Sequence, residues 1–410
     1  MRVIFLGHAC YLVEIDGVRI LTDPWLTDPI FEGLVERDPP LGFSVADLPG
    51  VDAIALTHAH LDHFNAPTLA ALSDKSLPVV HPPIRFTELD THLRRLGFTN
   101  LHARRDFAPF ELGSVSVIPT PARGSLDECA YLIAGREGRF WDGSDAPQPP
   151  ELIDEIAQRS GSIDAGGFSH NSFDQPALLG MTSVKGADHG PTSAAASARR
   201  LGVRAAIAGA SNMRWRGACG SVVTRKVIRR SRDDLRHRLQ QDAPHVQYLD
   251  LQPGDAWCAS GEIERGVVRG RAAAAVAHDY APLFLDTGES WSAAGRPSTA
   301  DAFERDLPTR TARAAEASLY LGQRVSIEVT GADAATYTVD FREPGSHPQR
   351  GDDGAAYALR LTDHDWKDLF ERKLSWQILL VSDRLAVTRF RPGAPPDGLH
   401  FVYAMQAIFP

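Results

Sequence analysis

The sequence predicts an α/β protein with two β-sheets faced by helices, followed by a smaller α+β domain. Short apolar runs bounded by Gly, Asp and Pro recur along the first part of the chain, and helical segments interrupt them. The length of 410 residues also exceeds that of one average domain. We therefore expect a larger domain over residues 1–260 and a smaller α+β domain over residues 261–410.

The first domain is expected to alternate strands with helices. The expected strands are Val3–Leu6, Tyr11–Ile15, Arg19–Leu21, Ala53–Thr57, Val79–His81, Val115–Ile118, Ala130–Ile133, Gly138–Trp141 and Val203–Ala208. The expected helices are Ala66–Leu72, Phe86–Leu96, Pro150–Gln158 and Pro191–Leu201. Residues 161–190 are rich in Gly, Ser, Asp and His, and we expect them to form a long functional loop.

The second domain shows a different order of patterns. Alanine-rich helical pieces are expected at Arg271–Ala277 and Ala312–Tyr320. The alternating stretches Val325–Val329, Thr336–Phe341 and Ala356–Leu361 predict strands, and the amphipathic stretch Trp366–Leu380 predicts a helix.

Composition limits the partners and the compartment. A net charge of -9 gives no sign of a nucleic-acid or membrane surface. The four cysteines, Cys10, Cys129, Cys219 and Cys258, form no Cys-x-x-Cys pair, so we expect neither a disulfide framework nor an iron-sulfur cluster. Since no signal-peptide pattern or long apolar span is found, we expect a cytoplasmic protein.

One segment carries most of the chemical information. The run from His58 to His63 contains three imidazoles and a carboxylate, directly after the apolar stretch Val51–Thr57. A loop leaving the end of a buried strand can fold His58 and His60 onto one point, while Asp62 and His63 face a second. The segment therefore predicts a pair of metal ions. A surface loop with several histidines is the alternative, but only 15 of 410 residues are His.

Together with this run, the segments Gly7-His8-Ala9 and Leu21–Trp25 resemble the metallo-β-lactamase superfamily, which has a four-layer αββα fold. The resemblance covers residues 1 to about 255. It implies that Asp23 orients a metal-binding histidine without binding the metal itself. The alternative is that Asp23-Pro24 simply begins a turn. It places His8 at the rim of the pocket.

The resemblance also implies a ligand just before the strand Ala130–Ile133, where superfamily members usually have a histidine. The stretch 123–129 has no histidine, so we expect Glu128 to take this place, with Asp127 as the second choice. Either acid could instead be a solvated loop residue. A carboxylate in place of an imidazole favours iron or manganese over a purely zinc site.

The bridging carboxylate of the superfamily is expected at Asp145 rather than at Asp142, which would lie on the strand itself. The pair Ser144-Asp145 resembles the Asn-Asp of the branch that contains CMP-N-acetylneuraminate hydroxylase. A bridging carboxylate holds two cations about 3.5 to 4 Å apart.

The last superfamily histidine is missing, because Ala208–Trp215 contains no imidazole. This segment also resembles the hydroxylase branch. We expect His189 to supply the ligand, with His170 as the other candidate; His189 could alternatively cap the helix after Pro191. The Rieske domain of the sialic-acid hydroxylases has no counterpart in this sequence, so electrons would have to come from elsewhere.

We therefore predict a dinuclear non-haem iron oxygenase that hydroxylates a small polar metabolite, using O2 and electrons from an external reductase. The expected metal ligands are His58, His60, Asp62, His63, Glu128, Asp145 and His189. Asp62 and His8 are expected to take part in catalysis. The side chains expected to bind an anionic substrate are His8, Arg123, Lys185 and Arg214.

The competing hypothesis is a metal-dependent hydrolase of the lactonase or phosphodiesterase type. In that case zinc or manganese would lower the pKa of a bridging water, and Asp62 would orient it. A non-catalytic metal-stabilised scaffold is the third possibility, but its signature would be missing ligands in the His58–His63 run, and all four are present.

Overall fold

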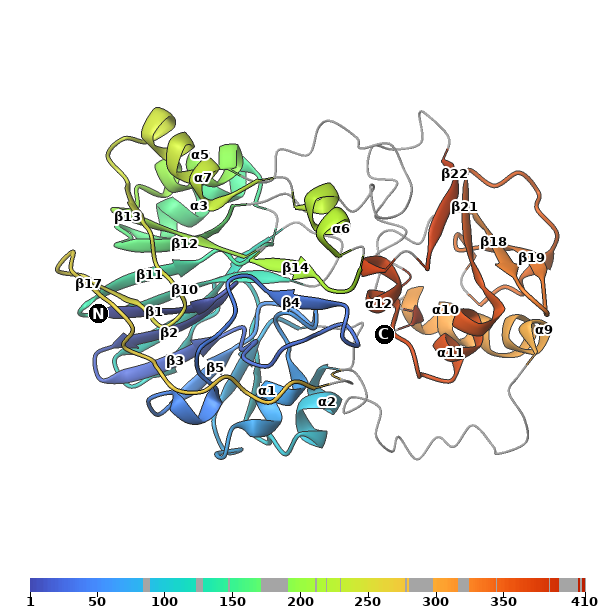
Figure 1. The fold of residues 1–410 in the computed structure, drawn as a ribbon, viewed down its shortest axis with the longest axis horizontal. Helices are drawn as coiled ribbons and strands as arrows, with labels where there is room; N and C mark the ends of the chain where they lie inside the picture. Colours follow the sequence, from blue (N-terminus) through green and yellow to red (C-terminus); the bar gives the residue numbers. More distant parts are fainter. Residues whose placement is uncertain are drawn as a thin grey trace. The chain divides into compact units, whose positions relative to one another are not determined.

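The computed structural model describes residues 1–83, 89–122, 128–146, 148–170, 191–210, 212–218, 220–228, 230–276, 279, 298–315, 324–343, 345–382, 384–390, 405, 408 and 409. These residues fall into two compact units, the first ending at Asp279 (Figure 1). The division therefore comes about twenty residues later than the boundary expected at 260.

The first unit contains two mixed β-sheets. One has eight strands in the order β17-β16-β1-β2-β3-β5-β6-β7. Its strands are β1 (Arg2–Gly7), β2 (Cys10–Ile15), β3 (Val18–Thr22), β5 (Ala53–Ala55), β6 (Val79–His81), β7 (Leu101–Ala103), β16 (Ala256–Cys258) and β17 (Ile263–Glu264). β3, β5, β6 and β7 run parallel, so the residues that follow them meet at one edge of the sheet.

The other sheet has seven strands in the order β15-β13-β12-β11-β10-β9-β8. Its strands are β8 (Phe110–Leu112), β9 (Val115–Pro121), β10 (Cys129–Gly135), β11 (Gly138–Asp142), β12 (Ala165–Ser169), β13 (Ala205–Gly209) and β15 (Gln247–Leu249). β11, β12, β13 and β15 are parallel to one another. A separate two-stranded ribbon pairs β4 (Val35–Arg37) with β14 (Met213–Trp215).

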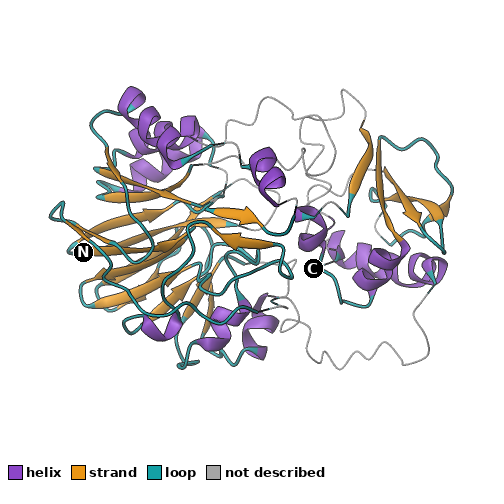
Figure 2. Ribbon diagram, in the orientation of Figure 1, coloured by secondary structure: helices purple, strands orange, loops and turns teal. Residues whose placement is uncertain are grey.

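Helices lie on the outer faces of the two sheets. Figure 2 shows α3 (Pro150–Ser160), α5 (Pro191–Leu201) and α7 (Arg232–Asp242) on one side, and α1 (Ala66–Ala71) and α2 (Leu89–Arg95) on the other. Among the described residues, this unit also contains η1 (Val45–Asp47) and α6 (Gly220–Val227). α7 begins with a capping box, in which the side chains of Ser231 and Asp234 satisfy each other's backbone amides.

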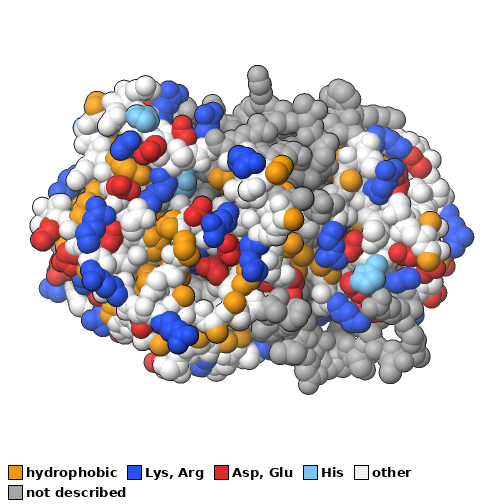
Figure 3. Space-filling model, viewed as in Figure 1, with side chains coloured by type: hydrophobic (Ala, Val, Ile, Leu, Met, Phe, Trp, Pro, Cys, Tyr) orange, Lys and Arg blue, Asp and Glu red, His pale blue; other side chains and the backbone are white. Residues whose placement is uncertain are grey.

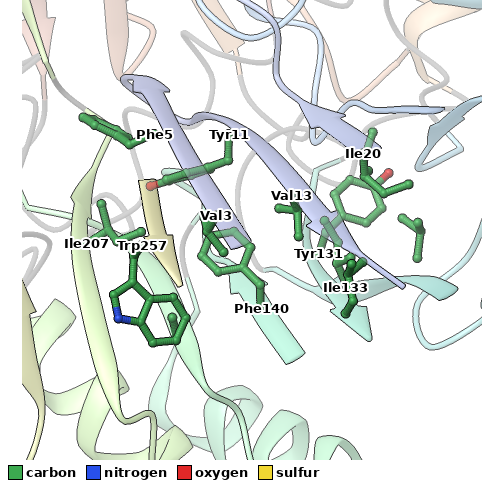
Figure 4. Packing of buried hydrophobic residues seen from close by; sticks show 14 of the residues in the cluster. Val3, Phe5, Tyr11, Val13, Ile20, Tyr131, Ile133, Phe140, Ile207 and Trp257 are labelled. Carbon is green, nitrogen blue, oxygen red and sulfur yellow. The ribbon is translucent and has the colours of Figure 1, made fainter. Parts of the chain in front are cut away.

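The main core lies between the two sheets. Side chains of β1 and β2, such as Val3 and Val13, meet Ile133 and Ile207 of the opposite sheet (Figure 4). The Tyr11 hydroxyl lies against the strands β12 and β13, where Gly167 and Gly209 leave room for it. This layer order of helix, sheet, sheet and helix confirms the predicted αββα fold.

The second unit is a five-stranded sheet with helices, in the strand order β20-β19-β18-β21-β22. Its strands are β18 (Arg324–Thr330), β19 (Ala335–Asp340), β20 (Gln349–Arg350), β21 (Tyr357–Thr362) and β22 (Ala386–Phe390). Its helices are α9 (Thr299–Asp301), the π-helical η2 (Ala302–Asp306), α10 (Leu307–Ala315), α11 (Asp363–Phe370) and α12 (Trp376–Val381). An aromatic stack holds its core, with the ring centroids of Phe303 and Tyr337 3.8 Å apart and those of Phe303 and Trp366 4.4 Å apart.

Three sequence expectations were wrong in detail. Ala165–Ser169, expected within a loop, forms the interior strand β12. The stretch Trp366–Leu380 forms two helices rather than one, separated by Glu371–Ser375, where Arg372 has a left-handed backbone (φ 55°). Residues 271–276 are not helical, because a short alanine run with little packing cannot stabilise an isolated helix.

The chain continues past β17 along the first unit as far as Asp279. The Asp279 carboxylate accepts hydrogen bonds from the backbone amides of Phe31 (2.8 Å) and Glu32 (2.7 Å). Both residues have left-handed backbones (φ 52° and 53°), and successive amides in this conformation form a concave anion-binding site. Burial raises the pKa of Asp279 to about 6, so the carboxylate is charged at neutral pH.

The visible surface carries charges of both signs. Lys and Arg side chains are interspersed with Asp and Glu on the described part of the face in Figure 3. Within the described ranges, no helix combines the length and the apolar character needed to cross a bilayer.

Candidate metal centre

Several strand ends bring polar side chains to one edge of the first unit. The loop that begins at His58 follows β5, Asp23 follows β3, and Asp145 follows β11. His8 lies in the turn between β1 and β2 at the same edge. Residues far apart in the sequence are thus brought together by the topology, as is usual for sites in open α/β sheets.

The backbone at this edge is unusually constrained. His8, Asp23, Ser144 and Ala210 all have positive φ, at 56°, 36°, 51° and 33°. Left-handed conformations are costly for residues other than glycine, and they persist where the surrounding structure fixes them. The turns are therefore held in place by their neighbours rather than by local preference.

His58 and His60 form the first half of the cluster. His58 Nε2 lies 2.8 Å from His60 Nδ1, so the two imidazoles converge on one point. Asp145 Oδ1 lies 3.7 Å from His58 Nε2. His58 is buried, whereas His60 is partly exposed.

His63 connects this half to a second group. Its Nε2 atom lies 3.5 Å from Asp145 Oδ1 and 3.7 Å from Asp62 Oδ2. His8 Nε2 completes the second group, at 3.3 Å from Asp62 Oδ2 and 3.4 Å from His63 Nε2. Asp145 belongs to the group of His58 and His63, and it borders the second group through His63, which the two groups share.

A buried hydrogen-bond network fixes the orientation of these imidazoles. Asp23 Oδ2 lies 2.7 Å from His63 Nδ1, which leaves His63 Nε2 to face the cluster. Asp23 also accepts hydrogen bonds from the Thr57 amide (2.8 Å) and from the Thr57 hydroxyl (2.6 Å). The Thr57 hydroxyl lies 3.0 Å from His58 Nδ1 and so orients that ring as well. Asp23 thus makes the contact that the sequence resemblance implies.

Burial and neighbouring charges shift the pKa values of the two histidines His58 and His63 in opposite directions. Burial, reinforced by the charge of His63, lowers the pKa of His58 well below its usual value, so its nitrogen lone pair is available. Burial also lowers the pKa of His63, but the carboxylates Asp145, Asp62 and Asp23 outweigh this effect and raise it well above its usual value. The same positive charge holds the pKa values of Asp62 and Asp145 low, against the opposing effect of burial.

The donor set fits divalent metal ions. Two groups of ligand atoms, His8-Asp62-His63 and His58-His63-Asp145, each lie within 4.8 Å of one another. Neutral imidazoles and ionised carboxylates bind zinc, iron and manganese. Three anionic carboxylates around His63 also explain why this site attracts a positive charge when no metal is bound.

Glu128 belongs to neither donor group found among the described residues. It directly precedes β10, and the amide of Cys129 donates to the Thr57 carbonyl (3.1 Å), one residue before the histidine loop. Its assignment as a ligand stays a prediction. His170, buried after β12, lies 2.8 Å from the Gly209 carbonyl through Nδ1, and burial lowers its pKa to about 4.

Two of the four expected substrate-binding residues lie outside the described part of the chain. Arg123 and Lys185 lie outside the described residues, as do Asp127, His189 and Ser211. Arg214 is described and lies on β14, where its guanidinium forms an ion pair with Glu36 of β4 (2.7 Å). His8 is 1% exposed, so its imidazole faces the donor cluster rather than solvent.

Two contributors to the site were not predicted from the sequence. Thr57 and Ser144 connect Asp23 to the imidazoles, and the Ser144 hydroxyl donates to Asp23 Oδ2 (3.2 Å). In the sequence, each of these two hydroxyl residues immediately precedes an expected metal ligand. That they both contact Asp23 cannot be predicted from this position, because only the fold places Asp23 between the two loops.

Comparisons with known proteins agree with this architecture. Residues 18–207 match the model of the β-lactamase superfamily domain. A protein of Mycobacterium tuberculosis named as a Rieske 2Fe-2S iron-sulfur protein is 29% identical over 172 residues, which cover 40% of this chain and 33% of the relative. The 4-amino-L-phenylalanyl-[CmlP-peptidyl-carrier-protein] 3-hydroxylase of Streptomyces venezuelae is 32% identical over 173 residues, which cover 39% and 32%. The aligned part thus spans about a third of the length of these relatives.

Solved structures also align with this chain, at low sequence identity. The diiron β-hydroxylase CmlA of Streptomyces venezuelae aligns with a TM-score of 0.45 at 19% identity, covering 64% of this chain and 54% of CmlA. An isothiocyanate hydrolase from Delia radicum gut bacteria aligns with a TM-score of 0.48 at 15% identity, covering 63% and 99%. With its αββα layers and the family domain matched over residues 18–207, the first unit of this chain has the metallo-β-lactamase fold.

Proposed function

We propose that this chain is a dinuclear non-haem iron oxygenase that hydroxylates a small polar metabolite. The ligands in this proposal are His58, His60, Asp62, His63, Glu128, Asp145 and His189. Manganese or zinc are the alternative metals.

The observation that carries the proposal is the position of Asp145. Its Oδ1 atom lies 3.7 Å from His58 Nε2 and 3.5 Å from His63 Nε2, and His63 is the residue that this donor group shares with the group of His8 and Asp62. A carboxylate in that position can bind two cations at once, at a separation of about 3.5 to 4 Å. The centre is therefore expected to be dinuclear.

The choice of iron rests on the carboxylates and on the relatives. Asp62 and Asp145 already contribute oxygen donors, and Glu128 would add a third where hydrolases of this superfamily usually have an imidazole. Oxygen-rich donor sets favour iron and manganese over zinc. One matched relative is named as a hydroxylase, which supports an oxygenase, and another is named as a metal-dependent hydrolase.

A reduced iron pair supplies the electrons and the oxygen-binding positions for O2 chemistry when it is bound. In the overall reaction, one oxygen atom enters a C–H or N–H bond and the other leaves as water, with two electrons from an external reductase and two protons. The protein holds the imidazoles in one tautomer through Asp23 and Thr57. The imidazoles of His8, His58 and His63 are shielded from water, since each is at most 1% exposed, whereas His60 is partly exposed and Asp145 is exposed to solvent.

The substrate and the partners are part of the same proposal. Arg123, Lys185 and Arg214 are proposed to bind a carboxylate or phosphate of the substrate. Arg214 would have to exchange its ion pair with Glu36 for the substrate. An external reductase and a cytoplasmic location complete the proposal.

Metal analysis combined with O2 consumption tests the proposal. The purified chain is reconstituted anaerobically with iron(II) or with zinc, and bound metal is measured by mass spectrometry. We expect two irons per chain, and O2 uptake that depends on a chemical reductant. A chain that binds only zinc, and cleaves lactones or phosphodiesters without O2, would refute the oxygenase.

Hydrolysis is the second candidate, and the imidazole-rich side of the cluster favours it. His58, His60 and His63 are the type of ligands that zinc prefers. Asp62 is positioned by His8 to accept a proton from a nucleophilic water. Replacing Glu128 by His would then increase zinc affinity and hydrolytic activity, whereas in an oxygenase it would lower iron binding.

A further inference from the structure

The imidazole of His8 is held in place by an unusual turn. Gly7 and His8 have consecutive positive φ values of 102° and 56°, and the strand pairing of β1 with β2 is irregular there. The Ala210 amide donates to the His8 carbonyl (3.0 Å), and a Cβ on Gly7 would lie 2.9 Å from Arg37 Cδ. Contacts from three segments thus fix a strained conformation, and such strain is typical of functional positions.

The turn directs His8 Nε2 into the second donor group. The three atoms His8 Nε2, Asp62 Oδ2 and His63 Nε2 form a triangle with sides of 3.3, 3.4 and 3.7 Å. A single point lies about 2.0 Å from all three corners, which is the usual distance from zinc to an imidazole nitrogen. The donors are therefore already spaced for one metal ion.

The protonation pattern points in the same direction. His63 Nδ1 is committed to the Asp23 carboxylate (2.7 Å), so a neutral His63 presents a lone pair at Nε2. Asp62 adds a negative charge, and the edge of the His8 ring packs against Trp25 with centroids 5.2 Å apart. Electron-pair donors that converge in a buried space require a cation or a shared proton between them.

We propose that His8 is a ligand of the second metal ion, with Asp62, His63 and Asp145. In this assignment His8, rather than His189, supplies the imidazole that is missing from Ala208–Trp215, the segment whose Ala210 amide holds the His8 turn. This assignment rests on the proposed dinuclear centre. The other arrangement, in which His8 Nε2–H only donates to Asp62 and orients it, is the outcome to be distinguished.

Metal binding to the purified chain tests the assignment without an activity assay. The wild type and His8→Asn are stripped with chelator and dialysed against buffered zinc, and bound zinc is counted. Asparagine tolerates left-handed backbone conformations, so this variant is expected to keep the turn. His81→Asn is the matched control, because His81 is a buried imidazole at the end of β6 that belongs to neither donor group.

We expect two zinc ions in the wild type and in the control. His8→Asn should retain one, and its affinity for the second should fall by at least about tenfold, since even partners outside the coordination sphere contribute that much. His8→Cys supplies a thiolate ligand, so cobalt(II) added to that variant should produce a sulfur-to-cobalt absorption band that the wild type lacks. This second variant tests ligation directly, even if His8→Asn unfolds.

The outcomes separate this inference from the proposed function. If the wild type binds two ions and His8→Asn binds the second with unchanged affinity, His8 only orients Asp62 and the ligand assignment is wrong. Absence of the thiolate band in a folded, cobalt-loaded His8→Cys would overturn the ligand assignment as well. If the wild type itself saturates with fewer than two ions, the dinuclear centre fails along with the assignment.

Discussion

Replacing Asp23 by asparagine should weaken metal binding without unfolding the protein. Thr57 donates its backbone amide to Asp23 Oδ1 (2.8 Å), so the amide oxygen of asparagine has to occupy that position. The asparagine NH2 group then replaces Oδ2, which lies 2.7 Å from His63 Nδ1. His63 would have to accept there and carry its proton on Nε2, the atom that both donor groups share.

The size of the effect follows from the role of the contact. Removing a partner that orients a metal-binding histidine typically lowers metal affinity about 10- to 100-fold, or about 1.4 to 2.7 kcal/mol. The Thr57 hydroxyl loses its Asp23 acceptor but has Ser144 Oγ at 3.1 Å and His58 Nδ1 at 3.0 Å as other partners. The folded state should therefore survive the change.

Calorimetric titration of the metal-free protein with zinc measures the affinity, and thermal unfolding of the metal-free protein monitors the fold. Ser144→Ala is the control, because it removes only the weaker 3.2 Å contact to Asp23 and should change affinity by less than Asp23→Asn does. Unchanged affinity in a folded Asp23→Asn would refute the tautomer argument. So would an equal loss in both variants.

Further predictions concern the packing and the pH dependence of the first unit. A Cβ on Gly209 would lie 2.1 Å from Tyr11 Oη but 3.4 Å from Cζ, so Gly209→Ala should cost about 1–3 kcal/mol and Tyr11→Phe should restore most of it. A Cβ on Gly167 would lie 2.7 Å from Tyr11 Cζ, a ring atom that phenylalanine keeps, so Tyr11→Phe should not rescue Gly167→Ala. Denaturant unfolding of the two double variants measures both effects. If Tyr11→Phe restored the same free energy of unfolding in both, the geometric argument would be wrong. Burial, aided by the charge of Asp23, raises the pKa of Asp142 from 3.8 to about 8. The contribution of Asp142 to the free energy of unfolding is therefore fully present below pH 4, where its carboxyl is protonated in both states, and is lost as the pH rises through 8. Asp142→Asn should therefore gain stability relative to the metal-free wild type between pH 5 and 8, and parallel unfolding profiles would contradict this.

Local patterns predicted most of the fold. β6 (Val79–His81) and α5 (Pro191–Leu201) have the predicted bounds, because their apolar residues follow the period of the element that they form. β12 was missed because its sequence Ala-Gly-Gly-Phe-Ser has no strand-like composition. Its Gly167 is explained only by the Tyr11 ring from the opposite sheet, and a contact of this kind has no local signal.

The candidate site shows the same limit. His58, His60, Asp62 and His63 could be predicted because one loop carries them all. The position of His8 beside Asp62 depends on the turn between β1 and β2 reaching the edge where β5 ends. The sequence shows an isolated histidine there, and only the pairing of the strands places it among the other donors.

The carboxylate of Asp279 has a consequence for how the first unit can be separated from the rest of the chain. A polypeptide cut at residue 260 would leave the amides of Phe31 and Glu32 without their acceptor, at the tip of the hairpin that leads into β4. β4 carries the buried Arg37, whose side chain packs under Gly7 next to His8. Truncation at residue 260 would therefore weaken the packing of Arg37 against Gly7, beside the proposed metal ligands. A truncated protein should extend through Asp279 if it is to have the same metal centre as the full chain.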